Sequence, residues 1–176
     1  MPTYTLISSV TVGSGGASTI DFNSIPSTYT DLILKLSTRS TAANIATEVR
    51  MRFNSDTGAN YNWTRAYSDG SSTVSQRGSI IGAPYTSFIL GSNTSGANTT
   101  SNTFGNSEYY IPNYAGSTQK SISNDAVLEN NATEAYAYLA AGIWTNTSAI
   151  NAISLFTNGA NFVQYSTAYL YGISNA

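Results

Sequence analysis

This chain of 176 residues has no cysteine, no histidine and few charged residues, and these features limit the functions that it can have. It contains no cysteine, which excludes disulfides, zinc–thiolate sites and a cysteine nucleophile. It contains no histidine, which excludes a Ser–His–Asp triad and imidazole metal ligands. Charged residues make up only 9% of the chain, against about 25% in an average soluble domain. The composition disfavours an enzyme, and we expect no catalytic residue, cofactor or metal site.

Small polar side chains take the place of charged ones. The chain has 26 Ser, 23 Thr and 18 Asn, and these 67 residues are 38% of it. The net charge of −2 and the pI of about 4.8 disfavour nucleic-acid binding. No apolar stretch approaches the roughly 20 residues of a membrane span, and the first residues lack the basic and apolar regions of a signal peptide. We therefore expect one globular domain over residues 1–176 that is not exported.

Apolar side chains recur with a period of two along most of the chain. In Val49–Phe53 they alternate with Arg50 and Arg52, and Asp31–Thr38 has the same alternation. This pattern is typical of half-buried strands. Further segments of this kind are Tyr4–Val12, Thr73–Ile81, Thr86–Leu90, Thr103–Ile111, Ser117–Val127, Ala149–Phe156 and Phe162–Ile173. The sequence predicts an all-β fold, an antiparallel β-sandwich or jelly roll of about 8–10 strands.

One segment, Thr133–Trp144, fits two structures. Its alanines suit a short helix, but a strand would place Tyr136 and Tyr138 on one face and Leu139 on the other. We favour the strand because the segments around it are strands.

Turn residues separate the predicted strands. Asp69-Gly70 and Asn158-Gly159 are strong signals for β-hairpins. Gly91–Ser101 has almost no apolar residue, so we expect an exposed loop there.

Two patterns of acidic residues have a functional and a structural interpretation. Asn54–Asn60 places oxygen-bearing side chains around Asp56, as a Ca²⁺ loop does, but one carboxylate favours a structural Asx turn. Asp125, Glu129 and Glu134 are close in sequence. Two such carboxyl groups could act as a glycosidase acid/base pair if the fold placed them about 5–9.5 Å apart across a cleft. Nothing in the local pattern directs these three side chains toward one another.

Tyrosine and arginine supply the candidate contact residues. Tyr165, Tyr169 and Tyr171 alternate in the last predicted strand, where they fit either the core or a contact with a neighbouring subunit. Residues 35–77 hold six bases and three acids, net +3, whereas residues 102–176 hold one base and four acids, net −3. Either the fold mixes these charges, or they support a head-to-tail contact between copies or docking on an acidic surface. Arg50 and Arg52 are the candidate residues for such a contact.

Four segments and the opening of the chain resemble small virion structural proteins of tailed bacteriophages, and in particular those of cyanophages. The segments are FNSDTGANYN (Phe53–Asn62), YIPNYAGSTQKSIS (Tyr110–Ser123), LENNAT (Leu128–Thr133) and YSTAYLYGIS (Tyr165–Ser174). The resemblance implies a β-sandwich of the virion surface, either a capsid decoration (cement) protein or a fibre tip, assembled in the host cytoplasm. It supplies no catalytic residues.

Two functional hypotheses follow. The first is a decoration protein, expected as a homotrimer, that binds the major capsid protein and stabilises the shell by favouring the assembled state. The second is a carbohydrate-binding or receptor-binding module of a fibre tip. Its candidate sugar contacts are Trp63, Tyr110 and Tyr114, with Trp144 more readily placed in the core.

Overall fold

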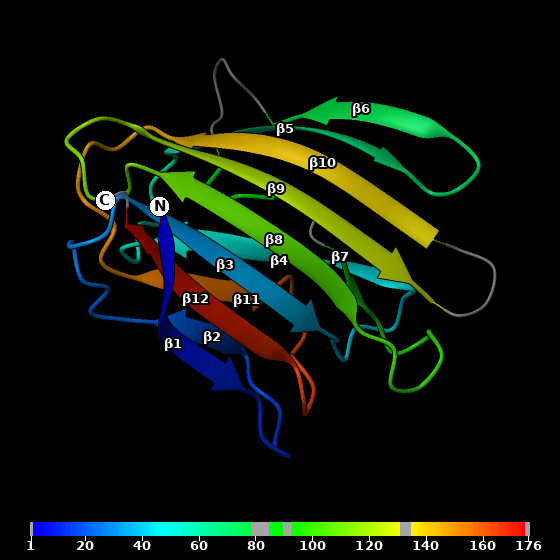
Figure 1. Ribbon diagram of the computed structural model, residues 1–176. Coiled ribbons are helices and arrows are strands. Elements are labelled where there is room, and N and C mark those ends of the chain that lie inside the picture. The colour runs from blue at the N-terminus through cyan, green and yellow to red at the C-terminus, as the bar shows by residue number, and fades with distance from the viewer. Residues whose placement is uncertain (1, 79–84, 90–92, 131–134, 175–176) are drawn as a thin grey trace.

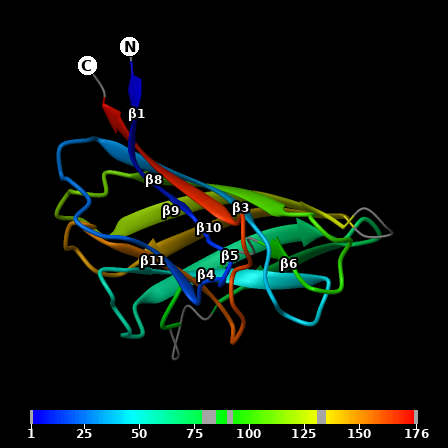
Figure 2. The same cartoon turned by 90° about the horizontal axis from the view of Figure 1, so that it is seen from below.

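The structure, a computed structural model, describes residues 2–78, 85–89, 93–130 and 135–174. These residues form twelve β-strands and no helix, so the predicted all-β class is confirmed. The strands make two antiparallel sheets that lie face to face as a sandwich (Figures 1 and 2). The larger sheet has the order β1 (Thr3–Thr11), β12 (Thr167–Ser174), β3 (Asp31–Thr38), β8 (Gly105–Pro112), β9 (Lys120–Glu129), β10 (Ala135–Trp144), β5 (Tyr61–Ser68) and β6 (Thr73–Arg77). The smaller sheet has the order β2 (Thr19–Phe22), β11 (Ile153–Thr157), β4 (Ala46–Phe53) and β7 (Asn93–Ser95).

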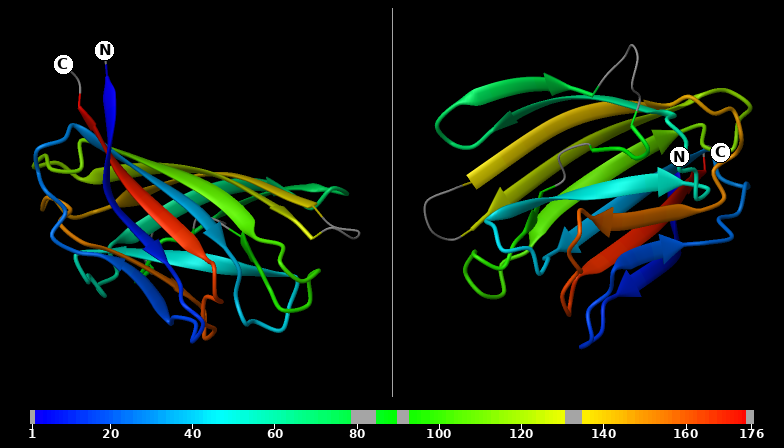
Figure 3. Two further views of the ribbon diagram at one scale, coloured as in Figure 1. Left: turned by 60° about the horizontal axis from the view of Figure 1, so that its bottom comes forward. Right: turned by 180° about the vertical axis from the view of Figure 1, so that it is seen from behind.

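Eight of the strands have the order of a jelly roll. When β5, β6, β9 and β10 are left out and the rest renumbered, the sheets read 1-8-3-6 and 2-7-4-5. That is the strand order of a jelly roll, in which two Greek keys form two four-stranded sheets. The strands β9, β10, β5 and β6, which we call the extension, lengthen one sheet only. The larger sheet therefore reaches beyond the smaller one on the side of β10, β5 and β6 (Figure 3).

The core of the jelly roll lies between the two sheets and is rich in aliphatic side chains. Alternation along β3 turns Leu32, Leu34 and Leu36 inward, and all three are buried. They belong to the same core cluster as Met51 of β4 and Leu155 of β11. The period of two in the sequence thus sets which residues fill the sandwich.

An aromatic cluster joins the jelly roll to the extension. The Phe53 ring meets the rings of Phe88 and Trp144 edge to face, with centroids 5.5 and 5.6 Å apart. The Tyr61 ring meets Phe88 at 4.9 Å. Gly142 makes room for this cluster, because a Cβ at that position would lie 2.6 Å from Cε1 of Phe88. The extension is therefore packed against the jelly roll by rings.

The sequence located most strands but misplaced several. Thr133–Trp144 is a strand as favoured, since β10 covers its described part. Three strands were not predicted: β2, β5 and β7. The predicted strand Thr86–Leu90 forms only an isolated bridge from Phe88 to Met51 in its described part, and the predicted strand end at Ile81 lies outside the described residues.

One predicted hairpin is present and the other is absent. Asp69-Gly70 lies in the turn that joins the paired strands β5 and β6. Asn158-Gly159 follows β11, but β11 and β12 belong to different sheets, so no hairpin forms there. The expected exposed loop Gly91–Ser101 is also wrong, because it contains β7 and fully buries Thr94 and Ser95.

Candidate interaction surfaces

The outer face of the larger sheet, the face directed away from the smaller sheet, collects exposed apolar side chains. The described residues include nine large hydrophobic side chains that are exposed, and seven of them lie on this face. These seven are Tyr4, Leu6, Tyr110, Val127, Leu139, Ile143 and Tyr169. Contiguous exposed apolar area is uncommon on monomeric proteins and marks interaction sites. The outer face is therefore the main candidate for an interaction surface.

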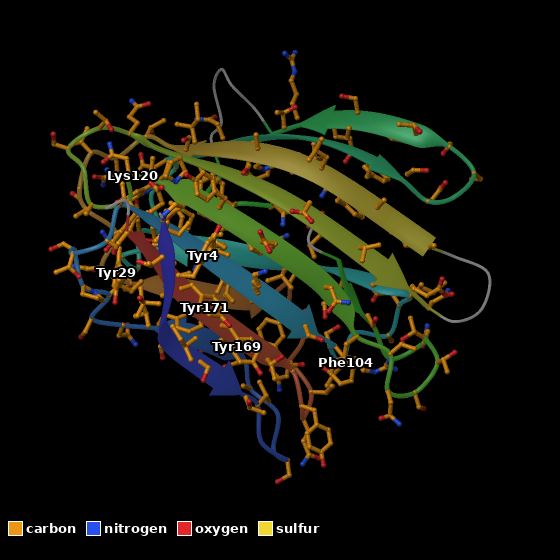
Figure 4. The ribbon with its side chains drawn as sticks, in the orientation of Figure 1. Tyr4, Tyr29, Phe104, Lys120, Tyr169 and Tyr171 are labelled. Atoms are coloured by element: carbon orange, nitrogen blue, oxygen red, sulfur yellow. The ribbon has the colours of Figure 1, made fainter. Side chains whose placement is uncertain are left out.

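The register of the strands sorts these side chains into two patches. One patch lies on the side of β1, β12 and β8, and we call it the tyrosine patch: Tyr4, Leu6, Tyr110, Tyr169 and the half-buried Tyr171. Figure 4 labels Tyr4, Tyr169 and Tyr171 of this patch. On the side of β9 and β10 lie Val127, Leu139 and Ile143, which we call the aliphatic patch.

A charged strip lies between the two patches. Lys35 Nζ and Glu108 Oε2 form an ion pair at 2.8 Å, and Asp125 is the next cross-strand neighbour of Glu108. The hydrogen bond and charge of Glu108 raise the pKa of Lys35. A shallow hollow of about 490 Å³ lies along this strip, and another of about 460 Å³ lies beside Ile143. The outer face is thus apolar at its sides and charged along its middle.

The outer face of the smaller sheet has a different chemistry. Arg50 and Arg52 share this face, as the sequence predicts. The Arg52 guanidinium lies 4.5 Å from the centre of the Phe156 ring, and its Nε donates a hydrogen bond to the Thr86 carbonyl at 2.8 Å. Arg50 lies 3.9 Å from a carboxylate oxygen of Glu48. The two arginines are ordered by their neighbours and remain partly exposed.

Two of the three predicted sugar contacts are buried. Tyr114 is completely buried, and its hydroxyl donates to the carbonyl of Pro26. Trp63 is 8% exposed and packs inside the sandwich against Tyr85. Neither ring is open to a sugar, so these two predictions are corrected. Tyr110 is exposed on the outer face, where its hydroxyl donates to Asp31 at 2.9 Å.

The predicted alternation of the C-terminal tyrosines is broken at Tyr165. The strand β12 begins at Thr167 and not at Phe162, and Tyr165 has a positive φ of 70°. A residue in that conformation does not continue the alternation of a strand. Tyr169 and Tyr171 therefore lie on the outer face, whereas Tyr165 lies at the end of the sheet with 66% of its surface exposed.

The Asp56 loop is a structural turn. One carboxylate oxygen accepts the Gly58 N–H at 2.7 Å, and the other accepts Asn60 Nδ2 at 2.8 Å and Trp144 Nε1 at 2.7 Å. Burial acts to raise the pKa of Asp56, but the hydrogen bonds from Asn60, Trp144 and Gly58 outweigh it and lower the pKa. Protein donors thus occupy both oxygens, as the Asx-turn interpretation requires.

The acidic residues of the described chain form no cluster that could hold a metal ion. Asp125 and Glu129 lie on the outer face of β9, and Glu134 lies outside the described residues. Within the described ranges no group of three or more Asp or Glu residues is placed to hold a metal ion. The same residues form no helix that is long and apolar enough to cross a membrane.

Sequence analysis overlooked the aliphatic patch as a candidate surface. Its signal was present, because Leu139 and Ile143 alternate with Tyr136 and Tyr138, so that both faces of β10 carry apolar groups. Apolar residues on both faces are typical of strands that are covered on both sides, and this pattern makes the outer face of β10 a candidate contact surface.

Comparisons with known proteins do not identify the chain. No protein family and no curated protein matches it. Among solved structures it is similar to a fructofuranosidase from Schwanniomyces occidentalis, the E230A variant complexed with fructosylnystose, at 10% identity and a TM-score of 0.21. The match covers 99% of this chain and 33% of that chain. The chain thus spans about a third of that enzyme's length, and the likeness is too low to support an argument.

Proposed function

We propose that this protein is a structural component of a virus particle, a capsid decoration protein of the tailed-phage type, and that copies of it pair through the outer face of the larger sheet. The uncovered outer face with its two apolar patches is the observation that supports the proposal. The jelly-roll order agrees with it, since this fold occurs in viral capsid proteins and in lectins. The fold alone does not decide between these, so the argument rests on the surface.

The arrangement of the outer face is self-complementary. Consider a two-fold axis that runs parallel to β8 and lies midway between two copies. It places the strands on one side of β8 in one copy opposite the strands on the other side of β8 in the second copy. In the row that crosses the sheet through Glu108, this places Tyr169 of one copy opposite Leu139 of the other. It also places Lys35 opposite Asp125. In this row an apolar ring meets an apolar side chain, and opposite charges meet on both sides of the axis. Glu108 meets Glu108 of the other copy on the axis itself, where each carboxylate is already paired with Lys35 of its own chain at 2.8 Å.

The outer face has the area that a stable pair requires. Eight strands about 4.8 Å apart span about 34 Å, and eight residues at about 3.3 Å each span about 26 Å. The face measures about 900 Å², and a standard interface buries about 800 Å² on each partner. We therefore propose a pair of copies in place of the homotrimer that was expected with the decoration protein.

The smaller sheet then faces away from the pair. Its outer face presents Arg50 and Arg52, and we propose that these residues contact an acidic surface of the major capsid protein. Opposite charges would set the register and the choice of partner in that contact.

Light scattering of the purified chain after size-exclusion chromatography tests the pairing. We expect twice 18.6 kDa, about 37 kDa, for the wild type and a single copy for Leu139→Lys. The matched control is Thr19→Lys, which adds the same charge to the exposed face of the smaller sheet and should leave the pair intact. A single copy or a trimer of about 56 kDa for the wild type would overturn the pairing.

Immunogold labelling of whole virions from the virus that encodes the chain tests the location. Gold spread evenly over the head would support the decoration protein. Gold confined to the tail or to one vertex would overturn it in favour of a fibre component, and unlabelled particles would overturn the structural role.

A further inference from the structure

We propose that a hollow at the end of β3, β8 and β12 binds an acidic sugar, one that bears a carboxylate. The hollow has a volume of about 290 Å³, near the lower end of small-molecule sites. Its lining includes Arg39, Ser101, Asn102, Phe104, Gln164 and Tyr165. The three strands are neighbours in the sheet, so their end loops meet at one place. The proposal goes beyond a structural role and does not depend on pairing through the outer face.

Tyr165 is the first reason to assign a ligand to this hollow. Six non-glycine residues in the described chain have a positive φ, and the other five are Asn or Ser. A tyrosine is unfavourable in this conformation, which Gly and Asn adopt most easily. Its ring gains little from the fold, since it is 66% exposed. Strained residues of this kind gather at functional sites.

The surroundings hold Tyr165 in this conformation. Its N–H donates to the Val12 carbonyl at 2.9 Å. The next residue, Ser166, is completely buried, and its hydroxyl donates to the Arg39 carbonyl and accepts the Arg39 N–H, both at 3.1 Å. The backbone on both sides is thus tied down, and the point where the Tyr165 side chain leaves the backbone is held beside the hollow.

Arg39 supplies positive charge that no acid in the described chain balances. It is 9% exposed, and Nη1 donates to Thr99 Oγ1 at 2.7 Å and to the Thr100 carbonyl at 2.9 Å. Nη1 also reaches Thr103, and Nη2 donates to the Thr99 carbonyl at 3.1 Å. Burial lowers the pKa of Arg39. All these acceptors are neutral, so Arg39 brings to the lining of the hollow a positive charge that has no counter-ion among the described residues.

The other lining groups fit a sugar. Phe104 and Tyr165 offer apolar ring surfaces to the C–H groups of a sugar ring, and the tyrosine adds a polar tip. The amides of Asn102 and Gln164 both donate and accept hydrogen bonds, as hydroxyl groups require. None of the described residues that line the hollow is acidic. The combination of ring faces, amides and an unbalanced arginine favours a sugar that carries a carboxylate.

Calorimetric titration of the full chain with galacturonic acid trisaccharide tests the proposal, with the neutral galactose trisaccharide of the same linkage as reference. We expect the acidic probe to bind at least tenfold more tightly than the neutral one, and to bind more weakly as salt is added. Equal binding of both probes, or binding of neither, would overturn the proposal.

Two tyrosine variants make the test specific. Tyr165→Asn keeps a residue that tolerates positive φ and removes the ring, so we expect at least tenfold weaker binding and an unchanged or higher unfolding midpoint. Tyr169→Ala is the control, because it removes an exposed tyrosine from the outer face and should leave binding unchanged. Full binding by Tyr165→Asn would overturn the proposal. Leu139→Lys, which tests pairing, should bind the acidic probe like the wild type, so the two proposals fail separately.

Discussion

The jelly roll and the extension obey the same alternation but stabilise their strands differently. In the jelly roll, leucines such as Leu34 lie between two sheets and are completely buried. In the extension, Arg65 of β5 faces inward beyond the aliphatic core. Its guanidinium lies 5.0 Å from the Trp63 ring centre, 5.5 Å from Tyr67 and 5.8 Å from Tyr138. Apolar area removed from water holds both regions, and the extension adds a set of rings around a cation.

The difference shows how a jelly roll can gain a new surface without losing its core. An added strand needs one partner edge and one packed face. The extension meets both needs on its inner side, where Arg65 also pairs with Glu48 of β4 at 3.1 Å. Its outer side is then free to carry Leu139 and Val127. Stability and interaction are thus divided between the two faces of the same strands.

The largest contrast is expected between two leucines. Leu34→Ala opens a cavity in the jelly roll and should lower the free energy of unfolding by about 2–5 kcal/mol. Leu139→Ala, at a position 68% exposed on the extension, should change it by at most about 0.5 kcal/mol in the single copy. Urea unfolding at low protein concentration measures both values. A cost at Leu139 as large as that at Leu34 would show that the outer face is packed within a single chain.

The next effect concerns the joint between the two regions. Asp56→Ala removes the acceptor of the buried Trp144 Nε1 and should cost about 1–3 kcal/mol. Asp56→Asn keeps an acceptor and should cost less. Because the folded-state pKa of Asp56 is lowered, its stabilising effect is complete above the unfolded pKa of about 3.9 and is lost as pH falls through the folded value.

Urea unfolding of the wild type and both variants between pH 2 and pH 7 measures this effect. The wild type should lose stability more steeply than Asp56→Asn as the pH falls. Parallel curves would contradict the role given to the Asp56 carboxylate.

The sequence could predict the jelly roll better than the extension for a physical reason. Asp31–Thr38 alternates cleanly because its inward side chains are leucines, and the predicted strand has the bounds of β3. The strand β5 was missed because Arg65 stands where an apolar residue was expected, and only the surrounding rings explain it. The short strand β7 was missed because Thr94 and Ser95 are buried polar residues, which composition assigns to a loop.

The candidate surfaces were only partly predictable. Alternation along the chain could place Tyr169 and Tyr171 on one face. It could not place Tyr165, because this residue lies in the turn before β12 and its own positive φ ends the alternation. Trp63 and Tyr114 were proposed as sugar contacts from residue type alone, and burial is not visible in residue type. Arg39 gave no signal, because its role depends on loops that meet only in the folded sheet.

A smaller effect is expected from the cation of the extension. Arg65→Gln removes a guanidinium that contacts three rings and Glu48, and should lower the free energy of unfolding by about 1 kcal/mol. The matched control is Arg77→Gln at the exposed end of β6, which should have no measurable effect. Thermal unfolding by calorimetry compares the two, and equal effects would mean that the rings and not the cation hold the extension.

The smallest effect is expected at the outermost turn of the extension, between β5 and β6. The N–H groups of Ser72 and Ser71 donate to Oδ1 of Asp69 at 2.8 and 2.9 Å, and with the Ser71 hydroxyl they lower the pKa of Asp69 to about 2. The contribution of this turn is therefore complete above the unfolded pKa of about 3.9 and is lost as pH falls toward 2.

The amide chemical shifts of Ser71 and Ser72 should titrate with a midpoint near 2 in the wild type and stay flat in Asp69→Asn. A midpoint near 3.9 would mean that these hydrogen bonds are not kept in solution. Because the turn lies at the surface, global stability should hardly change, and the loss should be confined to the hairpin that lies farthest from the jelly roll.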